Sequence, residues 1–209
     1  MARMKDMSNV AALLFDVVGS RGRARDARHR ALLAAVEVAN TLVTATDPLR
    51  FTVGDELQGI YPSVPDALRA AYTLRLAASP EAELRAGIGV GEVTVIDEER
   101  GIQDGSAWWH AREAIDAVRE RAADPGYRGL RTAIVGVEDP FLDATLGLID
   151  AHLARLRGTT VGTLRGLLEG LSNSEIAQRE SISESANSQR VINNDLRPLA
   201  DAIRAVSGG

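Results

Sequence analysis

Two runs of strand-forming residues each end in an aspartate beside a glycine, and a helical stretch separates them. Asp16 closes an apolar run that begins at Val10. Asp55 lies in a turn between two strand-like segments, residues 49–53 and 57–61. A strand, a crossover helix and a hairpin can bring the two carboxylates side by side, which is costly unless a cation or proton lies between them. The pattern therefore predicts a metal-dependent phosphate site, or a site descended from one.

Helices and strands continue to alternate up to residue 138. Apolar periodicity and turn residues predict helices over 24–46, 65–78 and 106–123, strands over 84–96 and 130–137, and a loop over 101–105. Glycines recur inside the strand that begins at Leu84, and interior glycines often let another backbone or a ligand approach closely. The sequence therefore predicts an α+β domain over residues 1–138.

No strand signal follows Asp139. Helical patterns cover residues 140–157 and 160–170, and further helices extend to about residue 206. We therefore expect a second, all-α domain over residues 139–209.

Composition narrows the class of protein. The chain has 209 residues and no Cys, which excludes disulfides and thiolate metal sites and is typical of a cytoplasmic protein. The three His residues have no zinc-site spacing, and no segment has the length of a membrane span. The net charge of −5 argues against general coating of nucleic acid. Residues 155–209, however, carry seven Arg and six acidic residues, so local DNA binding stays open.

The order of elements in the first domain, with Asp16 at a strand end and Asp55 in a hairpin, resembles class III nucleotide cyclases and GGDEF domains. The resemblance implies a ferredoxin-like sandwich with a central, mostly antiparallel sheet and flanking helices. It also implies that Asp16 and Asp55 hold Mg²⁺ or Mn²⁺ against a nucleotide, since two metal ions can stabilise both the attacking and the leaving oxygen. The ligand-binding candidates are Asp16, Val17, Gly19, Ser20, Arg21, Asp55, Glu56, Trp108 and Arg112.

Two positions depart from the cyclase pattern. Arg112 matches a cyclase arginine, but Trp108 stands where those enzymes keep an Asn. Phe51 stands where a Lys reads adenine. These departures favour binding over catalysis.

The runs Asp16-Val17-Val18-Gly19-Ser20-Arg21, Gly54-Asp55-Glu56-Leu57-Gln58-Gly59, Arg85-Ala86-Gly87-Ile88-Gly89 and Ala111-Arg112-Glu113-Ala114 are similar to the bacterial SatD family. That resemblance spans nearly the whole chain. It implies a cyclase-like sensor domain joined to a helical DNA-binding unit, and it implies no established reaction.

Residues 173–194 resemble a helix-turn-helix, with a turn at residues 181–183. Its second helix would present Ser185, Ser188, Gln189, Arg190, Asn193 and Asn194 to DNA. Asn187 stands where such units bury an aliphatic residue. An unpaired buried amide is destabilising, so Asn187→Val is expected to stabilise the unit. The alternative is a small helical dimerisation bundle without DNA.

The leading hypothesis is a ligand-responsive bacterial transcription regulator that acts as a homodimer. The alternative is a divalent-metal-dependent nucleotidyl cyclase or related nucleotide-processing enzyme. A third option is a scaffold whose first domain only dimerises. Taken singly, Asp16 is better interpreted as a turn or helix-cap residue and Asp55 as a hairpin-turn residue.

Overall fold

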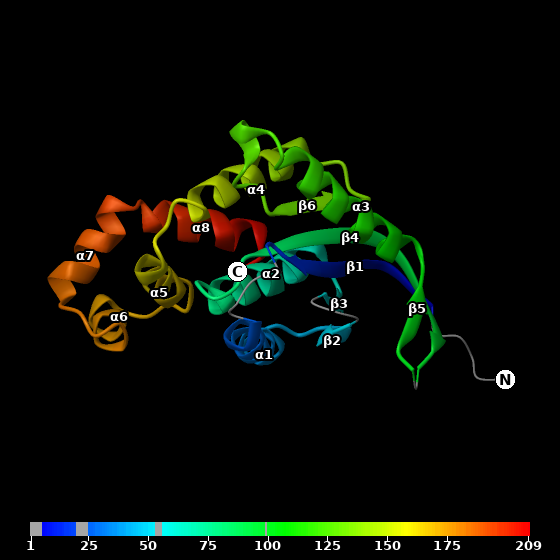
Figure 1. Cartoon of the computed structure of the whole chain (residues 1–209), viewed down its shortest axis with the longest axis horizontal. Helices are drawn as coiled ribbons and strands as arrows, with labels where there is room; N and C mark the ends of the chain where they lie inside the picture. The colour runs from blue at the N-terminus through cyan, green and yellow to red at the C-terminus, as the bar shows by residue number, and fades with distance from the viewer. Residues whose placement is uncertain (1–5, 20–24, 53–55, 99) are drawn as a thin grey trace.

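The computed structural model describes residues 6–19, 25–52, 56–98 and 100–209. In these residues the chain is a mixed α+β protein, with a central sheet flanked by helices and a group of helices beside it (Figure 1). The strands are β1 (Asp6–Val17), β2 (Asp47–Phe51), β3 (Leu57–Tyr61), β4 (Leu84–Asp97), β5 (Ile102–Asp104) and β6 (Thr132–Val135). The helices that flank the sheet are α1 (Arg25–Leu42), α2 (Val64–Ala78) and α3 (Ser106–Arg121). The expected mixed fold with a central sheet is confirmed.

The sheet has the strand order β2-β3-β1-β4-β5, and β6 pairs with β4. Only the β4–β6 pairing is parallel among the described strands, so the sheet is mostly antiparallel as expected. The short strand β5 corrects the expected loop over residues 101–105. Three residues between two glycines carry too little periodicity to indicate a strand, and pairing with β4 forms it.

The central strand β1 is buried on both faces, which explains its continuous apolar sequence. Its odd-numbered residues, such as Leu13 and Phe15, join the core beneath α1 and α2. Its even-numbered residues, such as Ala12 and Leu14, join a smaller cluster beneath α3. Figure 1 shows α3 on the opposite side of the sheet from α1 and α2.

Two glycines of β4 fix the distance between α3 and the sheet. A Cβ at Gly89 would lie 2.1 Å from the carbonyl oxygen of Ala107, and one at Gly87 would lie 2.4 Å from that of Ala111. Backbone atoms at such distances cannot be displaced cheaply, so side chains are excluded at both positions. The glycines that the sequence indicated as points of close approach therefore admit the backbone of α3.

The chain after Asp139 is helical, as expected. It forms α4 (Pro140–Leu153), α5 (Gly158–Leu168), α6 (Asn173–Arg179), α7 (Glu184–Asn193) and α8 (Leu196–Val206). Buried residues of this region, such as Leu146, Leu164 and Ile203, belong to the same apolar cluster as Leu13 and Phe15 of β1. The division into two domains at residues 138–139 stays a prediction, and the buried side chains on its two sides are contiguous.

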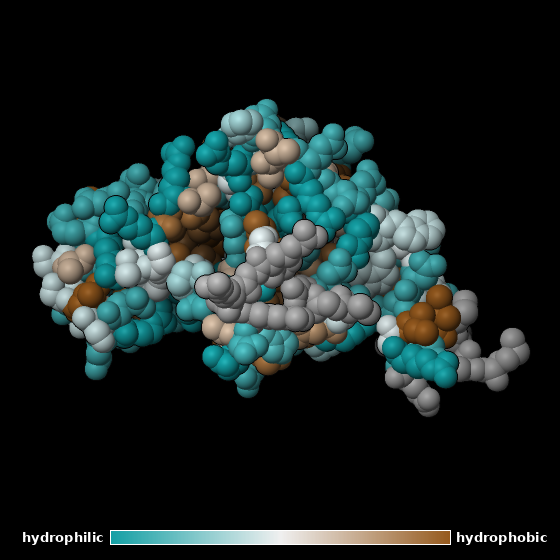
Figure 2. Space-filling view, viewed as in Figure 1, coloured by the Kyte–Doolittle hydropathy of each residue, from teal (hydrophilic) through white to brown (hydrophobic). Residues whose placement is uncertain are grey.

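Apolar surface is visible at several places in the view of Figure 2. An apolar patch marks the β4–β5 hairpin, where Ile96 and Ile102 are exposed. None of the helices in the described ranges combines the length and the apolar character that a membrane crossing requires.

Asn187 of α7 is fully buried and hydrogen-bonded, which corrects the expectation that Val would suit its position better. The Thr163 hydroxyl donates to Asn187 Oδ1 at 2.9 Å, and Asn187 Nδ2 donates to Asn173 Oδ1 at 2.9 Å. We now expect Asn187→Val to lower the free energy of unfolding by about 1–3 kcal/mol, because it leaves the buried Thr163 hydroxyl without an acceptor. Urea unfolding measures this.

The matched control is Asn193→Val, an exposed position on the same helix, which should change stability by less than about 0.5 kcal/mol. An Asn187→Val protein as stable as the wild type would contradict this account of the helical packing.

Candidate ligand-binding cleft

Asp16, the last residue but one of β1, is a buried carboxylate held by two guanidinium groups. It lies opposite Arg85 across the β1–β4 pairing, and Arg85 Nε donates to Asp16 Oδ1 at 2.7 Å. Arg119 of α3 donates to Asp16 Oδ2 from Nε at 2.9 Å and from Nη2 at 2.5 Å. Both carboxylate oxygens therefore already accept charge-assisted hydrogen bonds. The pairing ties the end of β1 to the C-terminal half of α3.

A second ion pair lies two helical turns earlier on α3. Arg112 Nη1 and Nη2 donate to the two oxygens of Glu56 at 2.8 and 2.9 Å, a bidentate pair. The hydrogen bond from Arg112 lowers the pKa of Glu56, against the opposing effect of burial, and it raises the pKa of Arg112. The hydrogen bond to Asp16 likewise raises the pKa of Arg119. Two carboxylates and three arginines thus lie along one edge of α3, with their charges largely paired.

The described residues do not fit a two-metal site. They contain no cluster of three or more His, Cys, Asp or Glu side chains that could hold a metal ion. A metal at Asp16 would have to displace Arg85 or Arg119 from its carboxylate. Asp55, the expected second ligand, lies outside the described residues, as do Ser20 and Arg21. In the structure, Asp16 therefore accepts hydrogen bonds from two arginines.

A cleft of about 640 Å³ opens between α3, the β4–β5 hairpin and the exposed part of the sheet. Its walls include Leu14, Gln58, Ile102, Gln103, Trp108 and Arg112. Two of its polar atoms are buried and have no hydrogen-bond partner among the described residues, namely Trp108 Nε1 and Gln103 Oε1. Leaving such atoms unpaired costs about 1–3 kcal/mol each. The wall of the cleft therefore contains one unpaired donor and one unpaired acceptor.

Two polar groups next to these atoms are already hydrogen-bonded. Gln103 Nε2 donates to Asp47 Oδ2 at 2.7 Å, so the amide is oriented with its oxygen unpaired. Trp109 is 64% exposed and its Nε1 donates to Asp104 Oδ1 at 3.0 Å. Of the two adjacent tryptophans, Trp108 alone packs against the core cluster beneath α3.

The structure brings together some of the predicted ligand-binding residues and separates others. Trp108 and Arg112 line the cleft, and Glu56 contacts it through Arg112. The side chain of Val17 is buried in the main core, away from the cleft. Gly19 has a φ of +68°, a left-handed conformation that suits glycine. Their roles in binding stay predictions.

Sequence reasoning missed Arg85, Arg119, Gln58 and Gln103. A usable signal existed for Arg119, which follows Arg112 at i+7 and so shares its helix face. The other three depend on strand register, which the sequence does not specify.

The helical region places α7 at the far end of the molecule from the β4–β5 hairpin (Figure 1). Ser185, Gln189 and Asn193 are exposed and recur every four residues, so they share one face of α7. The other three candidates have internal partners. Ser188 Oγ donates to Asn173 Oδ1 at 3.3 Å, Arg190 Nη1 donates to the Thr159 carbonyl at 2.9 Å, and Asn194 Nδ2 donates to the Arg190 carbonyl at 2.9 Å.

The central sheet and flanking helices define a mixed α+β protein that resembles nucleotide cyclase domains. The chain belongs to the SatD family, whose sequence model matches residues 12–197. No curated protein sequence matches the chain significantly.

Solved structures with a similar fold include nucleotide cyclases. The guanylyl cyclase domain of the RhoGC fusion protein from the aquatic fungus Blastocladiella emersonii is 17% identical, with 53% of this chain and 76% of that chain covered and a TM-score of 0.40. A bacterial light-regulated adenylyl cyclase is 11% identical, with 63% and 44% covered and a TM-score of 0.43.

Proposed function

We propose that the chain is a nucleotide-binding protein and that the cleft beside α3 is its binding site. The observation that carries this proposal is the pair of unpartnered buried atoms, Trp108 Nε1 and Gln103 Oε1. A nucleobase edge presents acceptors and donors side by side, which matches a wall that holds one unpaired donor and one unpaired acceptor. The cleft volume of about 640 Å³ lies within the range of small-molecule sites.

The remaining wall of the cleft suits a planar ring with an anionic tail. The two tryptophans offer flat apolar surface for a ring. Arg112 is held in a fixed orientation by Glu56, so it can contact an anionic group at little entropic cost. These features support a nucleotide over a purely apolar ligand.

We propose binding without a metal ion at Asp16, because its two oxygens are engaged by Arg85 and Arg119. The second candidate function is nucleotide processing of the cyclase type. The element order of the sheet, β1-α1-β2-β3-α2-β4, favours this candidate more directly than it favours a DNA-binding role. The test is turnover of ATP and GTP with Mn²⁺, and product formation by the wild type that Asp16→Ala abolishes would establish the second candidate.

We further propose that the helical region transmits binding to DNA and that the protein acts as a homodimer. Two features support DNA binding. A tight turn with Ser181 at φ +55° joins α6 and α7, and one polar face of α7 is exposed. Electrophoretic retardation of DNA from upstream of the chain's own operon tests the proposed DNA binding. Absence of retardation with and without ligand would remove the DNA role and leave the cleft proposal standing.

A thermal-shift screen of nucleotides, with and without Mg²⁺ or Mn²⁺, tests the binding proposal. Stabilisation grows with ligand excess over the dissociation constant. We expect at least one nucleotide to raise the melting temperature in metal-free buffer. For that nucleotide, Trp108→Phe should weaken binding roughly tenfold, because the ring is kept and one hydrogen bond is lost.

The matched control is Trp109→Phe, whose indole nitrogen is already bonded to Asp104 and whose side chain is mostly exposed. This control should weaken binding by less than about threefold. If every nucleotide left the melting temperature unchanged with and without metal, the binding proposal would be wrong.

A further inference from the structure

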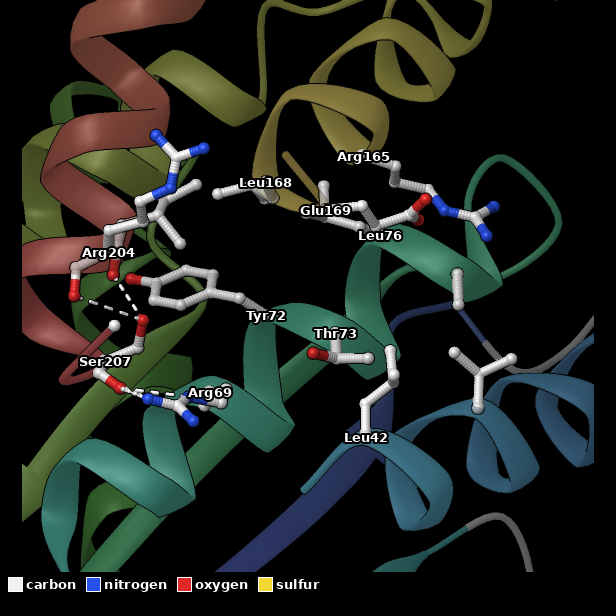
Figure 3. Close-up of a pocket in the computed structure, with 14 residues that line it drawn as sticks. Leu42, Arg69, Tyr72, Thr73, Leu76, Arg165, Leu168, Glu169, Arg204 and Ser207 are labelled. Carbon is white, nitrogen blue, oxygen red and sulfur yellow. Dashed lines mark hydrogen bonds between the residues drawn. The ribbon is translucent and has the colours of Figure 1, made fainter. Parts of the chain in front are cut away.

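A second pocket lies on the other side of the sheet, where α1 and α2 meet α5 and α8 (Figure 3). Its volume is about 430 Å³. Figure 3 shows side chains converging on it from all four helices, and it shares no residue with the cleft beside α3. The pocket therefore belongs to the contact between the helical region and the helices of the sheet.

The pocket is walled mainly by aliphatic side chains, namely Val38, Leu42, Leu76, Ala77, Leu168 and Ile203. Leu42 is 59% exposed although it ends a helix that packs on the core. Contacts between helices in a protein interior normally pack as densely as organic crystals. An unfilled pocket with mainly aliphatic walls is therefore unusual at such a contact. An apolar ligand body would fill it.

Arginine is the charged residue that recurs at the pocket. Arg69 donates to the carbonyls of Ser207 and Gly208, and Arg204 donates to the carbonyl of Leu167 and pairs with Asp201. Arg165 lines the pocket from α5, and its guanidinium has no ion-pair or hydrogen-bond partner among the described residues.

The one acidic side chain that lines the pocket is already paired. Glu169 forms an ion pair with Arg179 of α6. The side chains that line the pocket therefore carry a net positive charge. Among them, the guanidinium of Arg165 is the group that has no partner among the described residues.

We propose that this pocket binds a medium-chain fatty acid, with the acyl chain against the aliphatic walls and the carboxylate on Arg165. A guanidinium binds a carboxylate through two parallel hydrogen bonds, which matches one unpaired arginine at one rim. The volume falls in the small-molecule range, so a chain of roughly eight to ten carbons is accommodated. A fatty acid taken up as the free acid and one released by lipid hydrolysis would bind in the same way at this site.

Such a ligand would join two parts of the molecule. It would contact Leu76 of α2 and Leu168 of α5 together, so it binds best when the helical region is packed against the sheet. A ligand stabilises the state to which it binds more tightly. We therefore expect the fatty acid to slow amide exchange in α5 and α8 as well as in α2.

Isothermal titration of the full chain with octanoate, decanoate and 1-decanol tests the proposal. Each buried methylene strengthens binding about fourfold, so decanoate should bind about fifteenfold more tightly than octanoate. Decanol should bind at least about tenfold more weakly than decanoate, because it leaves Arg165 without a carboxylate. Equal affinities of decanol and decanoate, or the absence of binding, would overturn the proposal.

Two variants locate the site. Arg165→Gln should weaken decanoate binding at least about tenfold, whereas Arg197→Gln, an exposed arginine of α8 outside the pocket, should leave it unchanged. Thr73→Trp fills the pocket and should abolish binding, and far-ultraviolet circular dichroism checks that this variant is folded. Decanoate binding that is insensitive to Arg165→Gln would overturn the proposal even if Thr73→Trp fails to fold.

Discussion

Replacing Asp150 by Ala is expected to lower the free energy of unfolding by about 3–5 kcal/mol, the cost of removing one partner of a buried ion pair. Asp150 of α4 is fully buried. Arg75 Nη1 donates to its Oδ1 at 2.6 Å, and the backbone nitrogen of Arg131 donates to its Oδ2 at 2.8 Å. Thr132 Oγ1 also donates to Oδ1, at 3.3 Å. Truncation would leave the Arg75 guanidinium with only the neutral Thr132 Oγ1 as an acceptor, and the backbone amide of Arg131 without its carboxylate.

This effect should appear in one cooperative transition that includes the sheet, because Asp150 joins α4 to α2 and to the start of β6. Urea unfolding followed by circular dichroism and by tryptophan fluorescence measures it. Asp143→Ala, an exposed position on the same helix, is the matched control and should cost less than about 1 kcal/mol. A loss of under 1 kcal/mol for Asp150→Ala would show that the network does not hold the helical region to the sheet.

Replacing Asp16 by Ala is expected to destabilise the protein by about 2 kcal/mol in metal-free buffer. The variant leaves Arg85 and Arg119 without their shared carboxylate. The loss is smaller than for a fully buried pair because the side chain of Arg119 is 41% exposed and water can solvate it. The sign of the effect separates two roles. A carboxylate reserved for a metal is destabilising without that metal, so its removal would stabilise the metal-free protein.

Chemical denaturation in the presence of a chelator measures this difference. Asp116→Ala is the matched control, since Asp116 also pairs with Arg119 but is 61% exposed. It should cost less than about 0.5 kcal/mol. An Asp16→Ala protein that is more stable than the wild type without metal would restore Asp16 as a metal ligand.

The sequence predicted the element order well because the apolar periodicity of the long elements is strong. The strand that contains Asp16, the hairpin that ends at Tyr61 and the helix that begins at Ser106 all lie close to their expected positions. The strand β5 escaped prediction, because three residues carry no periodic signal and only pairing with β4 defines them.

The site was harder to predict than the fold. Residue types at strand ends indicated an acidic site, but the partners of Asp16 depend on register and on where α3 packs. Register places Arg85 opposite Asp16, and the glycines of β4 bring α3 close enough for Arg119 to reach it. The buried amide of Asn187 follows the same logic, since Thr163 and Asn173 approach it only after three helices pack together.

Tryptophan fluorescence tests the central claim most directly, because both tryptophans of the chain line the cleft beside α3. A nucleotide that binds there should quench their emission saturably in metal-free buffer. Trp109→Phe should retain the titration, and Trp108→Phe should shift its midpoint about tenfold higher. Emission that no nucleotide alters, with or without Mg²⁺ or Mn²⁺, would contradict the proposal that this cleft binds a nucleotide.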